Sequence, residues 1–289
     1  MAAKETPIVF ECDGERLLGI VTQPDEPVRT ARLGLVVIVG GPQYRIGSHR
    51  QFLLLARRAA AAGFATLRFD YRGMGDSDGA PRSFQDIDDD IAAAIEALMR
   101  ACPQVKTVAL WGLCDGASAA LLYCQRRRDP RVAALCLLNP WVRSEATLAR
   151  TRVRHYYPAR LLEREFWAKL LQGRAQLGRA LAELVRNWRL ARERGVAQEG
   201  PATFRRQMAE GMRGFAGHIL LVASGRDATA QEFLDCARDD PEWAGALESP
   251  RLTRFDLAEA DHTFSDALSR GAVDGATVEW LRGQMSLNP

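Results

Sequence analysis

The segment of the sequence best suited to chemistry is Gly112-Leu-Cys-Asp-Gly116, in which a cysteine lies between two glycines. The apolar run before it predicts a buried strand, and the small residues after it predict a helix. A nucleophile on a sharp strand-to-helix turn needs this spacing, because a Cβ at either glycine would clash. The helix N-terminus directs free N–H groups at the sulfur and favours a thiolate. Cys114 is therefore predicted to be a nucleophile; the alternative is a buried structural cysteine.

A cysteine nucleophile needs a base, and the chain contains four histidines. His262 follows the last predicted strand and is predicted to take the proton of the nucleophile. The carboxylate that orients His262 is predicted to be Asp227, which follows the penultimate strand. Asp261, Asp256 and Asp235 are alternatives for this carboxylate.

Two backbone N–H groups are expected to stabilise the negative oxygen of an acyl intermediate. One belongs to Asp115. The other is most simply that of Gly41, at the end of the first core strand, because Pro42 has no N–H. An ordinary strand-to-loop glycine is the alternative for Gly41. Gln43 and His49 are further candidates to line the substrate pocket, and for His49 a surface position fits equally well.

A doubly wound, mostly parallel α/β sheet is expected to position these residues, because apolar strand-like runs alternate with helical patterns. A β-hairpin is predicted to come first, from Ile8 to Thr22. Ser83 is the expected N-cap of one helix. The core strands are predicted at 34–39, 64–69, 105–110, 132–138, 218–224 and 252–257, and the helices at 50–62, 84–101, 114–127 and 276–285.

The alternation stops between the predicted strands at 132–138 and 218–224. Residues 141–215 are predicted to form a helical lid over the carboxyl edge of the sheet, where such sheets bind ligands. Residues 1–140 and 216–289 then form the core domain. Residues 141–217 hold 16 Lys and Arg but 7 Asp and Glu. This excess predicts an anionic substrate, partner or membrane surface, and a solvated arginine-rich face is the alternative.

Composition argues against several classes of protein. A net charge of +3 gives no reason to expect a nucleic-acid partner. The apolar runs are too short for a transmembrane segment, and no secretory signal is expected. The six cysteines form no C-x-x-C pair and no zinc spacing, so we expect free thiols, no metal and a cytoplasmic location. The predicted chemistry requires no cofactor.

Several motifs carry a family resemblance. The segment from Phe69 to Gly79 is similar to the D-x-R-G-x-G-x-S loop of the α/β-hydrolase superfamily. More narrowly, Gly40–Phe52, Trp111–Ala119 and Ala260–Ser265 resemble the exosortase A system-associated hydrolases of the first type. Those are bacterial proteins encoded beside exosortase and exopolysaccharide genes.

The resemblance implies the α/β-hydrolase fold and a triad of Cys114, Asp227 and His262, which follow one another in the chain order of that superfamily. The sequence departs from the superfamily at two positions. Cysteine replaces serine, as in dienelactone hydrolases, and Val39 replaces the usual histidine before the oxyanion glycine. The first departure argues against ordinary esterase and peptidase activity.

The predicted reaction is acyl transfer through a thioester at Cys114, from a small-molecule or carrier-linked ester or thioester. Release to water makes the protein a hydrolase, and release to an alcohol or amine makes it an acyltransferase. Two competing hypotheses are a non-catalytic binding or scaffold protein that uses the same cleft, and a redox role for Cys114.

Overall fold

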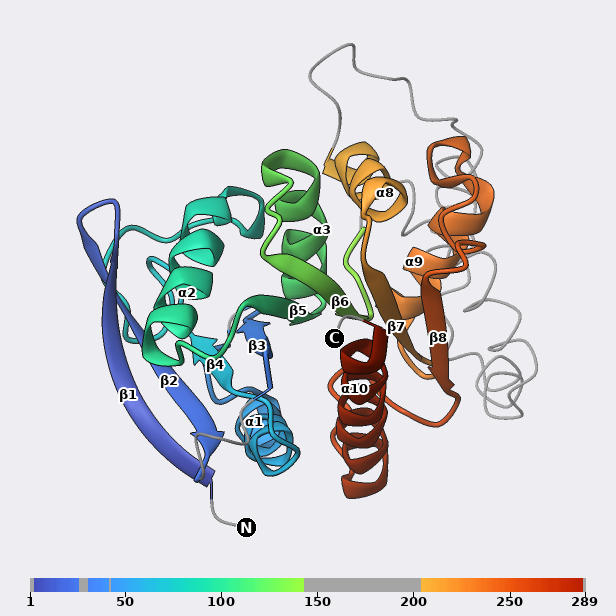
Figure 1. The fold of residues 1–289 in the computed structure, drawn as a ribbon. Helices are drawn as coiled ribbons and strands as arrows, with labels where there is room; N and C mark the ends of the chain where they lie inside the picture. The colour runs from blue at the N-terminus through green and yellow to red at the C-terminus, as the bar shows by residue number, and fades with distance from the viewer. Residues whose placement is uncertain (1–2, 26–30, 42, 143–203, 288–289) are drawn as a thin grey trace, which may run out of the picture.

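The computed structural model describes residues 3–25, 31–41, 43–142 and 204–287. Most of the predicted lid, residues 143–203, lies outside the described residues. Eight strands form one sheet in the order β1-β2-β4-β3-β5-β6-β7-β8 (Figure 1). The strands are β1 (Ala3–Cys12), β2 (Glu15–Pro24), β3 (Leu33–Ile38), β4 (Thr66–Phe69), β5 (Thr107–Leu113), β6 (Val132–Leu138), β7 (His218–Ser224) and β8 (Leu252–Leu257).

The pairing of the strands confirms a doubly wound, mostly parallel sheet. β1 and β2 form the predicted hairpin, and β2 runs antiparallel to β4. The pairs from β4 to β8 are all parallel. The hairpin turns at Asp13 and Gly14, which both have positive φ, as a tight turn of this hand requires. Parallel strands align their carboxyl ends, so residues that follow β3, β5, β6 and β7 meet at one edge.

Helices cover both faces of the sheet (Figure 1). α2 (Asp88–Ala101), α3 (Asp115–Arg127) and α8 (Phe204–Gly214) lie on one side. α1 (Gln51–Ala61) and α10 (Ala267–Leu287) lie on the other, and α9 (Ala228–Asp239) follows β7. None of the helices in the described ranges combines the length and the apolar character that crossing a bilayer requires.

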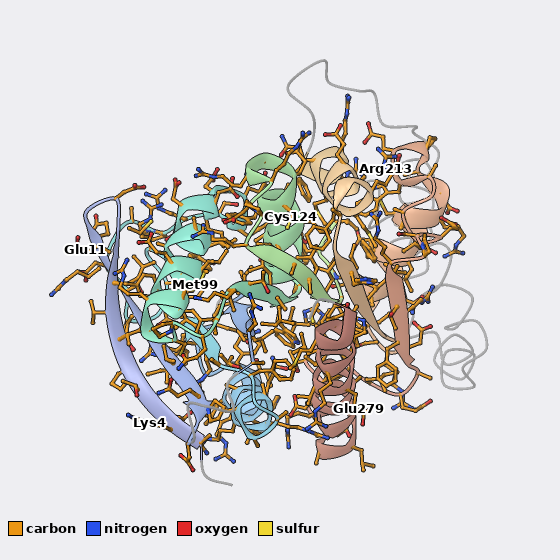
Figure 2. All side chains as sticks on the ribbon, in the orientation of Figure 1. Lys4, Glu11, Met99, Cys124, Arg213 and Glu279 are labelled. Carbon is orange, nitrogen blue, oxygen red and sulfur yellow. The ribbon has the colours of Figure 1, made fainter. Side chains whose placement is uncertain are left out.

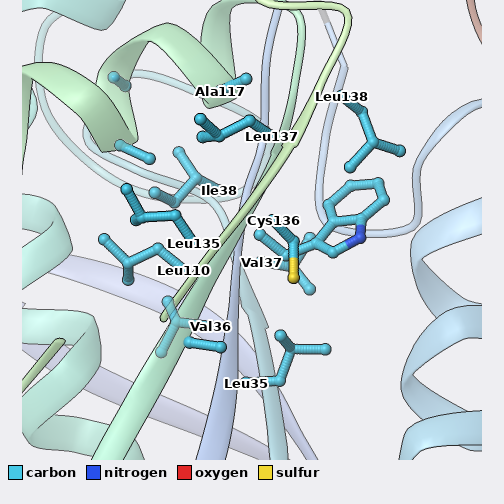
Figure 3. Close-up of a cluster of buried hydrophobic side chains, with 14 of the residues drawn as sticks. Leu35, Val36, Val37, Ile38, Leu110, Ala117, Leu135, Cys136, Leu137 and Leu138 are labelled. Atoms are coloured by element: carbon cyan, nitrogen blue, oxygen red, sulfur yellow. The ribbon is translucent and has the colours of Figure 1, made fainter. Parts of the chain in front are cut away.

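The core lies in the middle of the sheet, where β3 is buried along its whole length. Figure 3 shows Leu35, Val36, Val37 and Ile38 of β3 among apolar side chains of β5 and β6. Each such side chain stabilises the fold by roughly 1.5–3 kcal/mol when it is fully buried. The edge strand β1 instead carries exposed charged residues such as Lys4 and Glu11, at the periphery of Figure 2. Charges of this kind discourage pairing with another chain.

The helix boundaries differ from the sequence-based expectation in three places. Ser83 caps a short 3₁₀ turn, Phe84–Asp86, and the expectation that it caps the long helix is wrong, since α2 begins at Asp88. α9 was not expected. α10 begins nine residues before the predicted residue 276, because the Asp266 carboxylate accepts hydrogen bonds from two amides of its first turn.

α8 belongs to the stretch that the sequence assigns to the lid, and it packs on α3. Its residues Met208, Ala209 and Met212 are buried, and a Cβ at Gly211 would overlap the carbonyl oxygen of Leu121. This close backbone approach joins α8 to the helix that follows the cysteine turn. A lid role for residues 143–203 stays a prediction.

Asp274 on α10 is buried, and burial raises its pKa to about 6, against the opposing charges of Arg58 and Arg270. An Asp pKa is about 3.9 in an unfolded chain, so the folded state favours the neutral form. Burying the charged carboxylate lowers the free energy of unfolding. This destabilisation is absent below pH 4, grows between pH 4 and 6, and is complete above that range. We expect Asp274→Asn to raise the free energy of unfolding by about 1–3 kcal/mol at pH 7.5 and to leave it nearly unchanged at pH 4. Urea unfolding of both proteins at the two pH values measures this, and an equal difference at both values would contradict it.

Candidate active site

The predicted nucleophile turn is present between β5 and α3. Cys114 has φ 58° and ψ −120°, a conformation that side chains other than glycine rarely adopt. A Cβ at Gly112 would overlap the backbone of Gly116, and one at Gly116 would overlap the carbonyl oxygen of Ile38. The two glycines are therefore required for the strand to turn into the helix while lying against β3.

The Cys114 thiol is half-buried and donates a hydrogen bond to Oδ1 of Asp115 at 3.8 Å. The pKa of Cys114 is raised to about 12, first by burial and then by the negative charges of Asp115 and Asp227. A hydrogen bond from the backbone of Asp115 to the sulfur acts in the opposite direction. The expectation of a resting thiolate is therefore wrong, because burial and carboxylates outweigh the helix N-terminus.

Asp227 and His262 meet at the carboxyl edge of the sheet. Nδ1 of His262 lies 2.8 Å from Oδ2 of Asp227. The buried Asp227 is also the N-cap of α9, where it accepts hydrogen bonds from the amides of Thr229 and Ala230 at 3.0 and 3.1 Å. Three partners thus fix the carboxylate, and the ring is held by its Nδ1 edge, which leaves Nε2 for proton transfer.

The alternative carboxylates have other partners. Asp261 accepts hydrogen bonds from the amides of Thr263 and Ser265 and from the Ser265 hydroxyl, so it shapes the loop that carries His262. Asp256 pairs with Arg254 on the exposed strand β8. Asp235 pairs with Arg238 on α9.

The Asp115 carboxylate lies beside the sulfur, within hydrogen-bond distance of the thiol. Burial raises the pKa of this carboxyl. Three neighbours act to lower it: the Gly41 backbone, the Cys114 thiol and the positive charge of His262. Within the described residues the thiol has no hydrogen bond to the His262 ring. Both groups act on the side chain of Asp115, the thiol through a hydrogen bond and the imidazole through its charge.

The loop after β3 packs directly against the cysteine turn. A Cβ at Gly40 would overlap the carbonyl oxygen of Leu113 and would approach the amides of Gly116 and Asp115. Gly41 follows with φ 63°, which glycine adopts without strain. The structure therefore brings Gly41 and Asp115, the two predicted backbone donors, to the same place.

The predicted pocket residues Gln43 and His49 lie further along this loop. Gln43 is half-buried, and its side-chain oxygen accepts a hydrogen bond from the Ser48 amide at 3.1 Å. It therefore braces the loop. His49 is exposed, with φ 51°, which matches the surface alternative rather than a pocket position.

A buried carboxylate that the sequence analysis gave no role anchors the same loop. Asp70 has no exposed surface and accepts hydrogen bonds from the Arg45 amide at 2.6 Å and from the Arg45 guanidinium. Arg68 donates to the Arg45 carbonyl at 3.1 Å. Asp70 opens the D-x-R-G-x-G-x-S segment, so this motif holds the loop that carries the Gly41 amide.

Asn139 is a second residue that sequence reasoning missed. It is buried at the end of β6 with φ 44°. Its Nδ2 donates to the Ser224 hydroxyl at 2.8 Å and to the His262 carbonyl at 3.1 Å, and its Oδ1 accepts from the Ser224 amide at 2.9 Å. Asn139 thus ties two strand ends to the histidine loop. The signal was an asparagine that ends a core strand directly before a proline.

No group of three or more His, Cys, Asp or Glu side chains in the described part of the chain is arranged to hold a metal ion. The arrangement as described supplies a thiol, an imidazole oriented by a carboxylate, and backbone donors beside the sulfur. Such a set can carry an acyl group and transfer protons.

Comparison with known proteins identifies the family and the fold. The profile of the family described as serine aminopeptidase, S33, matches residues 31–209. No curated protein matches the sequence.

Among solved structures, the esterase Pf2001 of Pyrococcus furiosus is similar with a TM-score of 0.64 at 14% identity, over 97% of this chain and 91% of its own. Est1E of Butyrivibrio proteoclasticus, solved with ferulic acid bound, has a TM-score of 0.61 at 16% identity, over 95% and 99%. An esterase of Rhizomucor miehei has a TM-score of 0.63 at 18% identity, over 99% and 85%. At these identities the likeness shows a shared fold.

We expect Asn139→Ala to lower the free energy of unfolding by about 2–4 kcal/mol, because it leaves a buried group of Ser224 without its Asn139 partner and because alanine tolerates positive φ less well than asparagine. Asn139→Gly also removes the hydrogen bonds but tolerates the backbone, so it should cost about 1 kcal/mol less. Denaturant unfolding of the three proteins gives both values. If alanine and glycine proved equally destabilising, backbone strain at this position would be refuted.

Proposed function

Because the chain belongs to the serine aminopeptidase S33 family and is a hydrolase of the α/β-hydrolase fold, we propose that it cleaves esters or thioesters through an acyl-enzyme at Cys114. The observation that carries the proposal is the position of this thiol on the strained strand-to-helix turn, at the same sheet edge as the hydrogen-bonded pair of Asp227 and His262.

In the proposed mechanism the sulfur attacks the acyl carbon and its proton passes to Nε2 of His262. Asp227 holds Nδ1 and stabilises the imidazolium that forms. The carbonyl oxygen becomes negative and accepts hydrogen bonds from the amides of Gly41 and Asp115. His262 then protonates the leaving alcohol or thiol. Water attacks the thioester in the same way and releases the acid.

A sulfur nucleophile favours esters and thioesters over peptides. A thiolate leaves a tetrahedral intermediate more readily than an amine does, so an amide adduct tends to return to the starting amide. An alkoxide or a thiolate of the substrate competes far better than an amine with the Cys114 thiolate as the group that leaves the tetrahedral intermediate. The cysteine at position 114 therefore supports acyl ester chemistry, although the family takes its description from a serine aminopeptidase.

The finer part of the proposal concerns the acyl donor and acceptor. The resemblance to exosortase-associated hydrolases and the basic residues within 141–217 support an acyl group on an anionic carrier. If that segment excludes water and admits an alcohol or amine, the same acyl-cysteine serves an acyltransferase. Acyl release measured with and without candidate acceptors separates the two outcomes.

We expect incubation with activated esters and thioesters to add one acyl group to the protein, at Cys114. The library should include aromatic acyl esters, since Est1E, which has this fold, binds ferulic acid. Intact-protein mass spectrometry after a rapid acid quench, followed by peptide mapping, measures the adduct.

Cys114→Ala should give no adduct. Cys102→Ala is the matched control, because Cys102 is a buried thiol that donates a hydrogen bond to the side chain of Gln23 and takes no part in the proposed site. Acylation of Cys114→Ala at the wild-type rate would refute the proposed nucleophile.

We expect Asp227→Asn to lower kcat/KM for any substrate found by about 10²–10⁴-fold while leaving the fold intact. Asparagine caps a helix as well as aspartate does, so α9 keeps its N-cap, but its amide cannot stabilise an imidazolium. Steady-state kinetics and thermal unfolding of the same sample separate the two roles. Unchanged kcat/KM would argue against this carboxylate as the partner of His262.

A further inference from the structure

The side chain of Asp115 has no role in the mechanism above, although its backbone N–H does. Its carboxylate accepts a hydrogen bond from the Cys114 thiol at 3.8 Å, and the neighbouring Gly41 backbone acts to lower its pKa. The charge of His262 acts on the same carboxylate. An acyl substrate has to meet these same three groups: the sulfur, the Gly41 amide and the imidazole.

The carboxylate therefore lies where the carbonyl oxygen of a substrate would lie. A backbone N–H group placed to stabilise the negative oxygen of an intermediate also attracts any other negative oxygen close to it. In the described structure that oxygen belongs to Asp115. Its first-turn position on α3 adds the favourable end of the helix dipole, which holds an anion there.

The neighbouring carboxylate also determines the state of the thiol. A thiol that donates a hydrogen bond to a negative oxygen keeps its proton, because the thiolate would face a like charge. The direction of the Cys114 pKa, raised by burial and then by Asp115, agrees with this geometry.

We propose that the Asp115 carboxylate occupies the oxyanion site at rest and holds Cys114 as an unreactive thiol until an acyl substrate displaces it. The inference rests on the proposed function of Cys114 as the nucleophile. It makes substrate binding the event that activates the sulfur, and it protects a half-buried cysteine from alkylation and oxidation in the absence of substrate.

The displacement can be written with its atoms balanced. The substrate carbonyl oxygen takes the hydrogen bond of the Gly41 amide, and the carboxylate moves away without changing its charge. The thiol proton passes to Nε2 of His262 as the bond between sulfur and carbon forms. The π pair of the carbonyl moves to its oxygen, which the Gly41 and Asp115 amides then bind.

Asp115 could instead accept the thiol proton itself as a base. The two roles give opposite results when the charge is removed. If the carboxylate suppresses the thiolate, Cys114 should be more reactive in Asp115→Asn than in the wild type. If the carboxylate instead accepts the thiol proton, Cys114 should be less reactive in the variant.

We expect Asp115→Asn to speed the alkylation of Cys114 by iodoacetamide at pH 7.5 in the absence of substrate. Each unit by which the thiol pKa falls raises the thiolate fraction tenfold but lowers its intrinsic reactivity, so the net gain is about threefold per unit. A gain of threefold or more is therefore expected. Peptide mapping assigns the label to Cys114 and corrects for the other five thiols.

Glu259→Gln is the matched control, because Glu259 is an exposed carboxylate on the histidine loop that pairs with Arg226 and does not contact the sulfur. Its alkylation rate should equal that of the wild type. An unchanged or slower rate in Asp115→Asn would overturn the proposal. This assay needs no turnover, so it can fail while the hydrolase proposal stands, and the reverse is also possible.

A measurement on the wild-type protein guards against a variant that does not fold. The Gly41 amide proton should move upfield in NMR spectra when Asp115 is protonated, at a pH above the ordinary Asp range, because burial raises that pKa. The Thr263 amide is an internal control. It donates to Asp261, whose pKa is lowered by the Ser265 hydroxyl, so it should respond at lower pH. A Gly41 amide that does not respond, or responds together with Thr263, would overturn the occupancy of the oxyanion site.

Discussion

The site depends on one steric constraint, the approach of three backbones at the carboxyl edge of the sheet. β3 and its loop lie so close to the turn after β5 that Gly40, Gly112 and Gly116 have no room for a Cβ. This approach forces Cys114 into positive φ, turns its side chain out of the strand, and brings the Gly41 amide beside it. The strain at Cys114, of the order of 1–3 kcal/mol, is sustained by the buried strands on either side. The backbone contacts that position the proposed nucleophile are therefore the same contacts that pack the core.

The histidine half of the site is held by hydrogen bonds rather than by steric contact. Asp227 is both a helix cap and the partner of His262, so the strand end, the helix and the ring are positioned together. Asn139 and Ser224 join neighbouring strand ends to the loop that carries the ring. All of these polar groups are buried or half-buried, so an unpaired member costs roughly 1–3 kcal/mol and the network is strongly specified. The half-buried loop around His262 therefore holds its ring in a fixed orientation.

Much of this arrangement could be predicted from the sequence, because it follows from local patterns. The core strands are continuous apolar runs, and the G-x-C-x-G spacing is typical of a sharp turn between a strand and a helix. The roles of Asp70 and Asn139 could not be predicted, because their partners lie up to 123 residues away along the chain. α10 was predicted too short, because its early turns contain glycines that lower helix propensity. In the structure a Cβ at Gly275 would lie 3.0 Å from the guanidinium of Arg58, which donates to the Gly271 carbonyl. Tertiary contact outweighed local preference there.

The state of the thiol illustrates how magnitudes decide between two opposing effects. A helix N-terminus stabilises a nearby anion by about 0.3–1 kcal/mol, and by about 2 kcal/mol in the best cases. Two unit charges 4 Å apart repel by about 4 kcal/mol at the effective dielectric of a protein surface. The first effect follows from any cysteine that begins a helix, whereas the second depends on the single residue after it. An aspartate at position 115 therefore adds to burial in reversing the expectation that the rest of the turn creates. At Cys114 it is burial and the residue after the cysteine, and not the helix N-terminus, that determine the direction of the pKa shift and favour the thiol.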